Sequence, residues 1–111
     1  MTQEAEGSCP SPRYVPSRTD RLYAITRADL SVGLRAAQAC HALIAWTLKH
    51  GEPCENLVVL QVPGRLALED LVRHLHGRVE LFREPDLDGQ LTAIAAGPEN
   101  WREVSSIGLM R

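Results

Sequence analysis

The sequence predicts a small three-layer α/β domain in which a four-stranded mixed β-sheet is flanked by helices. Strand-like and helix-like segments alternate along the chain. A continuous apolar run at 56–62 is typical of a central strand covered on both faces. The order strand, helix, strand implies right-handed crossovers and therefore a parallel pair at the centre of the sheet.

The composition is that of one globular domain. Of 111 residues, 44% are hydrophobic and 23% are charged. The formal net charge of −2 argues against a strongly basic nucleic-acid surface, although a local basic patch remains compatible with it. Lys49 is the single lysine of the sequence, so any mechanism that needs a lysine has one candidate.

Cysteine usage and the apolar runs indicate a cytoplasmic protein. Cys9, Cys40 and Cys54 form no CxxC pair, which favours a reducing compartment over a disulfide framework. The N-terminus lacks the features of a signal peptide, and no apolar run approaches the roughly 18 residues of a membrane span. His41, His50 and Cys54 follow no recognised metal-ligand spacing, so we expect neither a metal nor another cofactor.

The first half of the chain predicts an arm, a strand and a helix. Residues 1–19 are rich in Pro and Ser, and they predict a flexible N-terminal arm before a domain at 20–111. β-branched and aromatic residues at 22–26 predict the first strand. A turn then leads into a helix at 32–49, in which Asp29 or Ser31 can accept a free N–H of the first helical turn.

The helix at 32–49 is almost wholly apolar apart from Gln38 and His41 in its middle. Small residues would let its backbone lie close to a sheet. These residues are Ala36, Ala37, Ala39 and Ala42.

The second half of the chain completes the alternation. Leucines at helical spacing predict a second amphipathic helix at 66–75. Two strands are predicted at 79–82 and 91–96, and the short loop between them suits an antiparallel pair. A weakly amphipathic last helix is predicted over 99–107.

The start of the first helix is a candidate anion site. Its free N–H groups and partial positive charge suit a phosphate or a carboxylate, and Arg27 and Arg35 flank it. Gln38 follows Arg35 on the same helical stripe, and His41 lies about 80–100° around the helix from that stripe. The alternatives are that Arg35 and Gln38 lie at a solvated edge, and that His41 is a satisfied core residue or one that only supports a neighbouring group.

A second candidate site is the acidic loop at 83–89, which contains Glu84, Asp86 and Asp88. It follows a strand at the edge where α/β domains usually place their sites. Thr92, at the start of the next strand, could add a hydroxyl group to this site. The alternative is a solvated acidic turn.

These motifs together resemble the second, archaeal and eukaryotic type, peptidyl-tRNA hydrolase family. The run at 36–42 (Ala-Ala-Gln-Ala-Cys-His-Ala), preceded by Asp29-Leu30 and Gly33, is similar to the family signature. The strand at 91–98 resembles the closing strand of the family, which ends in Gly-Pro. Arg83-Glu84 falls where the family has Arg-Asp, and the resemblance covers about residues 20–107.

The resemblance implies a mixed four-stranded sheet, a homodimer, and hydrolysis of the ester that joins a peptide to the 3′ end of tRNA. It implies that Arg27 and Arg35 contact the RNA, since both keep a positive charge for phosphate. The implied catalytic positions are Asp29, Gln38, His41, either Glu84 or Asp86 as the acid, and Thr92. If this interpretation holds, Arg27, Arg35, Gln38, the acid and Thr92 converge at one cleft.

The sequence departs from the family pattern in its first turn. The turn of the family carries lysines and is about two residues longer, whereas the turn here has no lysine and ends in Arg35. Two alternative functions follow from this difference. One is a diverged, non-catalytic relative that binds RNA, a peptide or a protein, and the other is a small-molecule hydrolase with a closed pocket.

Overall fold

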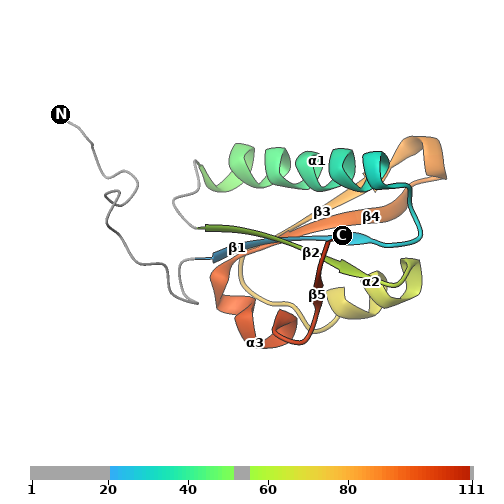
Figure 1. The fold of residues 1–111 in the computed structure, drawn as a ribbon. Coiled ribbons are helices and arrows are strands. Elements are labelled where there is room, and N and C mark those ends of the chain that lie inside the picture. Colours follow the sequence, from blue (N-terminus) through green and yellow to red (C-terminus); the bar gives the residue numbers. More distant parts are fainter. Residues whose placement is uncertain (1–20, 52–55, 111) are drawn as a thin grey trace.

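A computed structural model describes residues 21–51 and 56–110 (Figure 1). The predicted arm at 1–19, together with Cys9 and Cys54, lies outside the described residues. Within the described part of the chain, no helix is long and apolar enough to cross a membrane.

The structure is a three-layer α/β fold (Figure 1). Helix α1 covers one face of the sheet, and α2 and α3 cover the other face. The helices and strands, in chain order, are β1 (Arg21–Arg27), α1 (Val32–His50), β2 (Asn56–Val62), α2 (Arg65–Val72), β3 (Val79–Glu84), β4 (Gln90–Ala96), α3 (Trp101–Val104) and β5 (Gly108–Leu109).

The sheet is mixed, with the strand order β3-β4-β1-β2-β5. The α1 crossover joins β1 to β2, which are parallel, with Arg21 opposite Asn56. β4 pairs antiparallel with both β1 and β3. The predicted fold class is therefore confirmed, and β5 extends the four main strands by a fifth of two residues.

Two predicted helices differ from the structure at their C-terminal ends. The α2 helix ends at Val72 rather than at residue 75, because the following amides bond to carbonyls three residues back and tighten the chain into a turn. The predicted helix over 99–107 is instead a 3₁₀ turn (Pro98–Asn100) followed by the four-residue α3. Gly108 then pairs with Gln61 at the edge of β2, so this part of the chain is extended.

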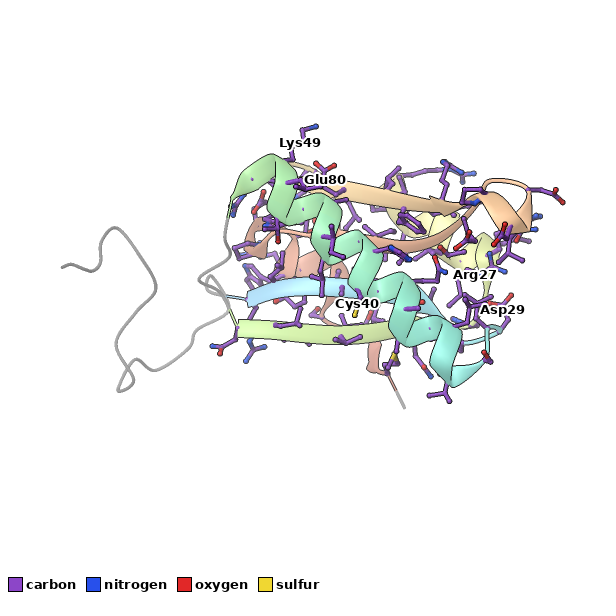
Figure 2. All side chains as sticks on the ribbon, turned by 90° about the horizontal axis from the view of Figure 1, so that it is seen from above. Arg27, Asp29, Cys40, Lys49 and Glu80 are labelled. Atoms are coloured by element: carbon purple, nitrogen blue, oxygen red, sulfur yellow. The ribbon has the colours of Figure 1, made fainter. Side chains whose placement is uncertain are left out.

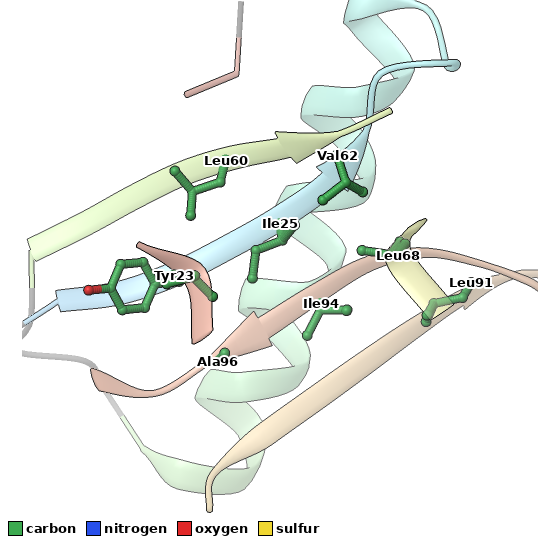
Figure 3. Close-up of a cluster of buried hydrophobic side chains, with 9 residues drawn as sticks. Tyr23, Ile25, Leu60, Val62, Leu68, Leu91, Ile94 and Ala96 are labelled. Atoms are coloured by element: carbon green, nitrogen blue, oxygen red, sulfur yellow. The ribbon is translucent and has the colours of Figure 1, made fainter. Parts of the chain in front are cut away.

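The larger hydrophobic core lies between the sheet and α2 (Figure 3). Its buried side chains are Tyr23, Ile25, Leu60, Val62, Leu68, Leu91, Ile94, Ala96 and Val104. Alternate residues of β1 and β2 point to this face because the side-chain period of a strand is two. In β4, Leu91 and Ile94 are three residues apart, because the pairing of β4 with β3 is irregular between them.

A smaller core lies under α1, where Ala93 and Ala95 of β4 meet Ala42 and Trp46. These alanines allow the close approach of helix and sheet that the sequence predicts. Of the four small helix residues named above, Ala39 and Ala42 face the sheet, whereas Ala36 and Ala37 are exposed.

We predict that Leu68→Ala lowers the free energy of unfolding by about 2–5 kcal/mol, because it leaves a cavity in the larger core. Leu68 is fully buried, whereas the neighbouring Leu66 is 72% exposed. Leu66→Ala is therefore the matched control, with an expected change within about 0.5 kcal/mol. Urea denaturation of both variants measures the difference, and equal effects would contradict the packing of α2.

Candidate functional site

The candidate site lies where the N-terminal half of α1 crosses β4 and β3. Gln38 is on the buried side of the helix, four and eight residues before the buried Ala42 and Trp46. Because residues at i and i+4 share a helix face, Gln38 faces the sheet together with Ala42 and Trp46. The side chain of Gln38 is only 1% exposed, so its amide group must find hydrogen-bond partners inside the protein.

Both ends of the Gln38 amide are hydrogen-bonded. The Thr92 hydroxyl donates to Gln38 Oε1 at 2.7 Å, and Gln38 Nε2 donates to Glu84 Oε1 at 2.9 Å. A hydroxyl donor at one end and a carboxylate acceptor at the other fix the orientation of the amide. The Thr92–Gln38–Glu84 chain therefore runs from the buried start of β4 to the end of β3.

Glu84 is held as a carboxylate at the end of this chain. The Gln38 side-chain N–H is the main cause that lowers the pKa of Glu84, and the Asp86 backbone N–H, at 3.2 Å from Glu84 Oε2, is the second. A positive charge on His41 lowers the pKa of Glu84 further. Glu84 is therefore ionised at neutral pH.

His41 lies beside this site, stacked on Phe82 of β3. The ring centroids are 4.5 Å apart and the planes differ by 12°. His41 is exposed, so its interpretation as a core histidine is wrong. Phe82 and Glu84 are two residues apart on one strand, which places their side chains on the same face, the face that α1 crosses.

Arg27 and Asp29 form a separate ion pair at the N-terminal end of α1 (Figure 2). Arg27 Nη2 lies 2.7 Å from Asp29 Oδ2, and Nε donates to Asp29 Oδ1 at 3.0 Å. Arg27 Nη1 also donates to Gln90 Oε1 and to the Leu91 carbonyl oxygen. The hydrogen bond from Arg27 is the main cause that lowers the pKa of Asp29. Asp29 is thus bound to Arg27.

The structure also shows which residue caps α1 and which residue Arg35 contacts. Ser31, rather than Asp29, caps α1, because its Oγ accepts a hydrogen bond from the Leu34 N–H. Arg35 Nη1 donates to Gln61 Oε1 on β2. Arg35 therefore reaches the opposite side of α1 from Glu84, although spacing places Arg35 and Gln38 on one helical stripe.

The structure brings together Gln38, Glu84 and Thr92, with His41 beside them. It does not bring Arg27, Asp29 or Arg35 into hydrogen-bond contact with this group. Between the two candidate acids, Glu84 binds Gln38, and Asp86 contributes its backbone N–H while its side chain is exposed.

Two residues that the sequence interpretation missed support the site. Phe82 stacks on His41, and its carbonyl oxygen lies 3.4 Å from the Thr92 hydroxyl. Thr26 Oγ1 donates to the Thr92 carbonyl oxygen from the neighbouring strand β1. Alternate residues of a strand share a face, so Phe82 lies on the same face as Glu84. This spacing is the sequence signal that could have identified Phe82.

Two hollows lie on the other face of the sheet. One, of about 240 Å³, lies between β1, β2 and α3, and the other, of about 400 Å³, lies between α2 and the segment at 103–107. Neither is lined by Gln38, Glu84 or Thr92. Among the described residues, no group of three or more His, Cys, Asp or Glu side chains is placed to hold a metal ion.

Comparison with known proteins supports the fold alone. No family model and no curated protein matches the chain. Among solved structures, a protein of unknown function from Agrobacterium tumefaciens superposes with a TM-score of 0.63 at 11% sequence identity. The match covers 82% of this chain and 97% of that protein. The architecture therefore occurs in a protein whose sequence is very different.

We predict that the Gln38→Leu variant raises the pKa of Glu84, because the substitution removes the side-chain N–H that stabilises the carboxylate. In the unaltered protein, NMR titration of the Glu84 side chain should give a pKa below the ordinary glutamate range. Asp86→Asn is the matched control, since it keeps the Asp86 backbone N–H and should leave this titration nearly unchanged. An unchanged pKa in Gln38→Leu would contradict the hydrogen bond.

Proposed function

We propose that the chain hydrolyses the ester bond between a peptide and tRNA, with Glu84 as the group that activates water. The observation that carries this proposal is the Thr92–Gln38–Glu84 chain. It joins three residues from α1, β3 and β4 that lie up to 54 positions apart in the sequence. All three occupy positions that the resemblance implies as catalytic.

The chemistry follows from the acceptor at the end of this chain. An ionised Glu84 takes a proton from a water molecule as the water oxygen attacks the ester carbonyl. Gln38 is 1% exposed and acts through Glu84, because its Nε2–H fixes the orientation of the carboxylate. When the tetrahedral intermediate collapses, the ribose oxygen leaves with the proton that Glu84 accepted. The products are a peptide carboxylic acid and a free tRNA 3′ end.

His41 and Phe82 extend the site toward solvent. Their stacked rings form an aromatic surface next to Glu84. Bases stack on exposed aromatic side chains in single-stranded RNA recognition, and the acceptor end of tRNA is single-stranded. The proposed substrate is present during translation, so the proposal includes a cytoplasmic location.

A second candidate function is binding of RNA or a peptide without catalysis. The observation that favours it is the engagement of Arg27, which is 5% exposed and bonded to Asp29, Gln90 and Leu91. Arg27 therefore brings no unpaired positive charge to the Thr92–Gln38–Glu84 chain, where a cation could stabilise an ester oxyanion. Lys49 lies with Glu80 at the opposite end of α1 from Arg27 and Asp29 (Figure 2), at a distance of 3.6 Å between Nζ and Oε2.

We predict that Glu84→Gln lowers the hydrolysis of peptidyl-tRNA by about 10²- to 10⁴-fold, since the amide cannot take a proton from water. The measurement is release of the peptide from peptidyl-tRNA under single-turnover conditions. Asp86→Asn is the matched control, and it should retain the native rate.

Binding of tRNA, measured on the same proteins, separates the two candidate functions. Tight binding without turnover by the unaltered chain would favour the non-catalytic function and overturn the proposed hydrolase. Equal rates for Glu84→Gln and the unaltered chain would overturn the role of Glu84.

A further inference from the structure

We propose that the peptide part of the substrate binds as an added strand along the free edge of β3, parallel to β3, with its ester carbonyl level with Glu84. The inference rests on the proposed function, because it describes how that site holds the peptide of peptidyl-tRNA. It depends on the backbone of β3, which the proposed chemistry does not use.

β3 ends the sheet on one side. In the strand order β3-β4-β1-β2-β5, β3 pairs with β4, and its other edge carries no strand among the described residues. The opposite end of the sheet is covered in part, because β5 pairs with Leu60 and Gln61 of β2. An uncovered strand edge is a template for another extended chain, and peptides bind to many proteins in this way.

The hydrogen bonds to β4 show which residues of β3 face the free edge. The Gly97 N–H donates to the Arg78 carbonyl oxygen at 2.9 Å. The Gly89 N–H donates to the Glu84 carbonyl oxygen at 3.0 Å. Because the backbone groups of alternate residues point to the same side of a strand, the even-numbered residues of β3 face β4. The residues whose N–H and carbonyl groups face the free edge are therefore Val79, Leu81 and Arg83.

The side chain of Leu81 adds an apolar contact at this edge. Val79 packs against the larger core, and Leu81, two residues later, shares its face of the sheet. Leu81 is 39% exposed. An added strand would cover this side chain, because neighbouring strands are only about 4.8 Å apart.

The position of Glu84 sets the direction of the peptide. Glu84 is the last residue of β3, and the proposed reaction takes place at the carboxyl end of the peptide. An antiparallel peptide would place that end near Val79, about 16 Å from Glu84. The peptide therefore runs parallel to β3, and the tRNA continues beyond Glu84.

The hydrogen bonds of a parallel ladder follow from this direction. The last peptide residue lies opposite Arg83, which brings the ester carbonyl level with Glu84. The Arg83 N–H then donates to the carbonyl oxygen of the penultimate peptide residue, and the Leu81 carbonyl oxygen accepts from the N–H of the same residue. The fourth residue from the carboxyl end is bonded in the same way to Leu81 and Val79.

Recognition through the backbone suits a substrate whose peptide varies in sequence. Every peptide offers the same N–H and carbonyl groups, so the ladder accepts peptides of many sequences. The peptide lies beside the sheet rather than over it. The exposed ring of His41, which stacks on Phe82 on the α1 face, therefore stays open for a base.

Single N-methyl groups in the substrate test the ladder on the unaltered protein. The substrates are tRNAs that carry an acetylated pentapeptide with one methylated backbone nitrogen. Methylation of the penultimate residue removes an N–H and places a methyl group between two strands, so it should lower kcat/KM by about 10-fold or more.

Methylation of the third residue from the carboxyl end is the matched control. Its N–H points away from β3 in the parallel ladder, so kcat/KM should change by less than about 2-fold. The fourth residue should behave like the penultimate one. Equal effects at the penultimate and third residues, or no effect at either, would overturn the inference and leave the proposed hydrolysis in place.

Two variants of Leu81 test the same ladder from the side of the protein. Leu81→Pro removes the outward N–H, whereas Leu81→Ala keeps the N–H and loses the same side chain. An edge strand accepts proline where its N–H faces solvent, and thermal unfolding checks that both variants fold. KM for the pentapeptidyl-tRNA should be about 3- to 10-fold higher for Leu81→Pro than for Leu81→Ala. Equal KM values in two folded variants would overturn the inference, and the N-methyl series decides if Leu81→Pro does not fold.

Binding without turnover separates a failure of the inference from a failure of the proposed hydrolysis. The probe is the same pentapeptide joined through an amide to 3′-amino-adenosine, which resists hydrolysis. NMR should show slower amide hydrogen exchange at Leu81 and Arg83 when the probe binds. Exchange at Phe82, whose N–H faces β4, should stay the same.

Each outcome of the binding experiment has a definite meaning. Protection of Leu81 and Arg83 in a chain that hydrolyses no peptidyl-tRNA would support the added strand and overturn the hydrolysis. No protection would overturn the inference. Equal protection by adenosine alone, or by a higher protein concentration without the probe, would also overturn it, because a nucleotide or a second copy would then occupy the edge.

Discussion

The buried amide of Gln38 sets the rotation of α1 on the sheet. A buried amide without partners costs about 1–3 kcal/mol, so the helix must present Gln38 to a donor and an acceptor at once. Thr92 and Glu84 supply them from adjacent strands. Because successive helical residues are about 100° apart, this one requirement directs every other side chain of α1. His41 is turned onto Phe82, and Cys40 and Ile44 are turned to solvent.

Most of the fold could be predicted from the sequence, because the local spacing of apolar residues distinguishes strands from helices. The strands at 56–62 and 91–96 and the helix at 32–49 agree with the structure to within one residue at either end. The C-terminal end could not be predicted this way. The extension of Gly108–Leu109 depends on the free edge of β2, which is a contact between segments about 50 residues apart.

The candidate site, too, could be predicted only as far as it depends on neighbouring residues of the sequence. Helical spacing places Arg35 and Gln38 on one stripe, but it does not say which strand lies under each residue. In the structure the two side chains reach opposite edges, toward β2 and β3. The sequence could not decide between Glu84 and Asp86 as the acid. Strand alternation would place both on one face, but β3 ends before Pro85, so only Glu84 lies on the strand. The pairing of Arg27 with Asp29 is a turn contact that spacing alone does not reveal.

The position of β1 in the sheet has a consequence for folding during synthesis. β1 is the first described strand to leave the ribosome, yet it lies between β2 and β4. Its antiparallel partners come about 70 residues later, since Tyr23 pairs with Ala96. One edge of β1 therefore stays unpaired until β4 has been made, and a chain that stops earlier has no closed core. Such distant pairing slows folding, so we expect this domain to fold as a unit only when its synthesis is nearly finished.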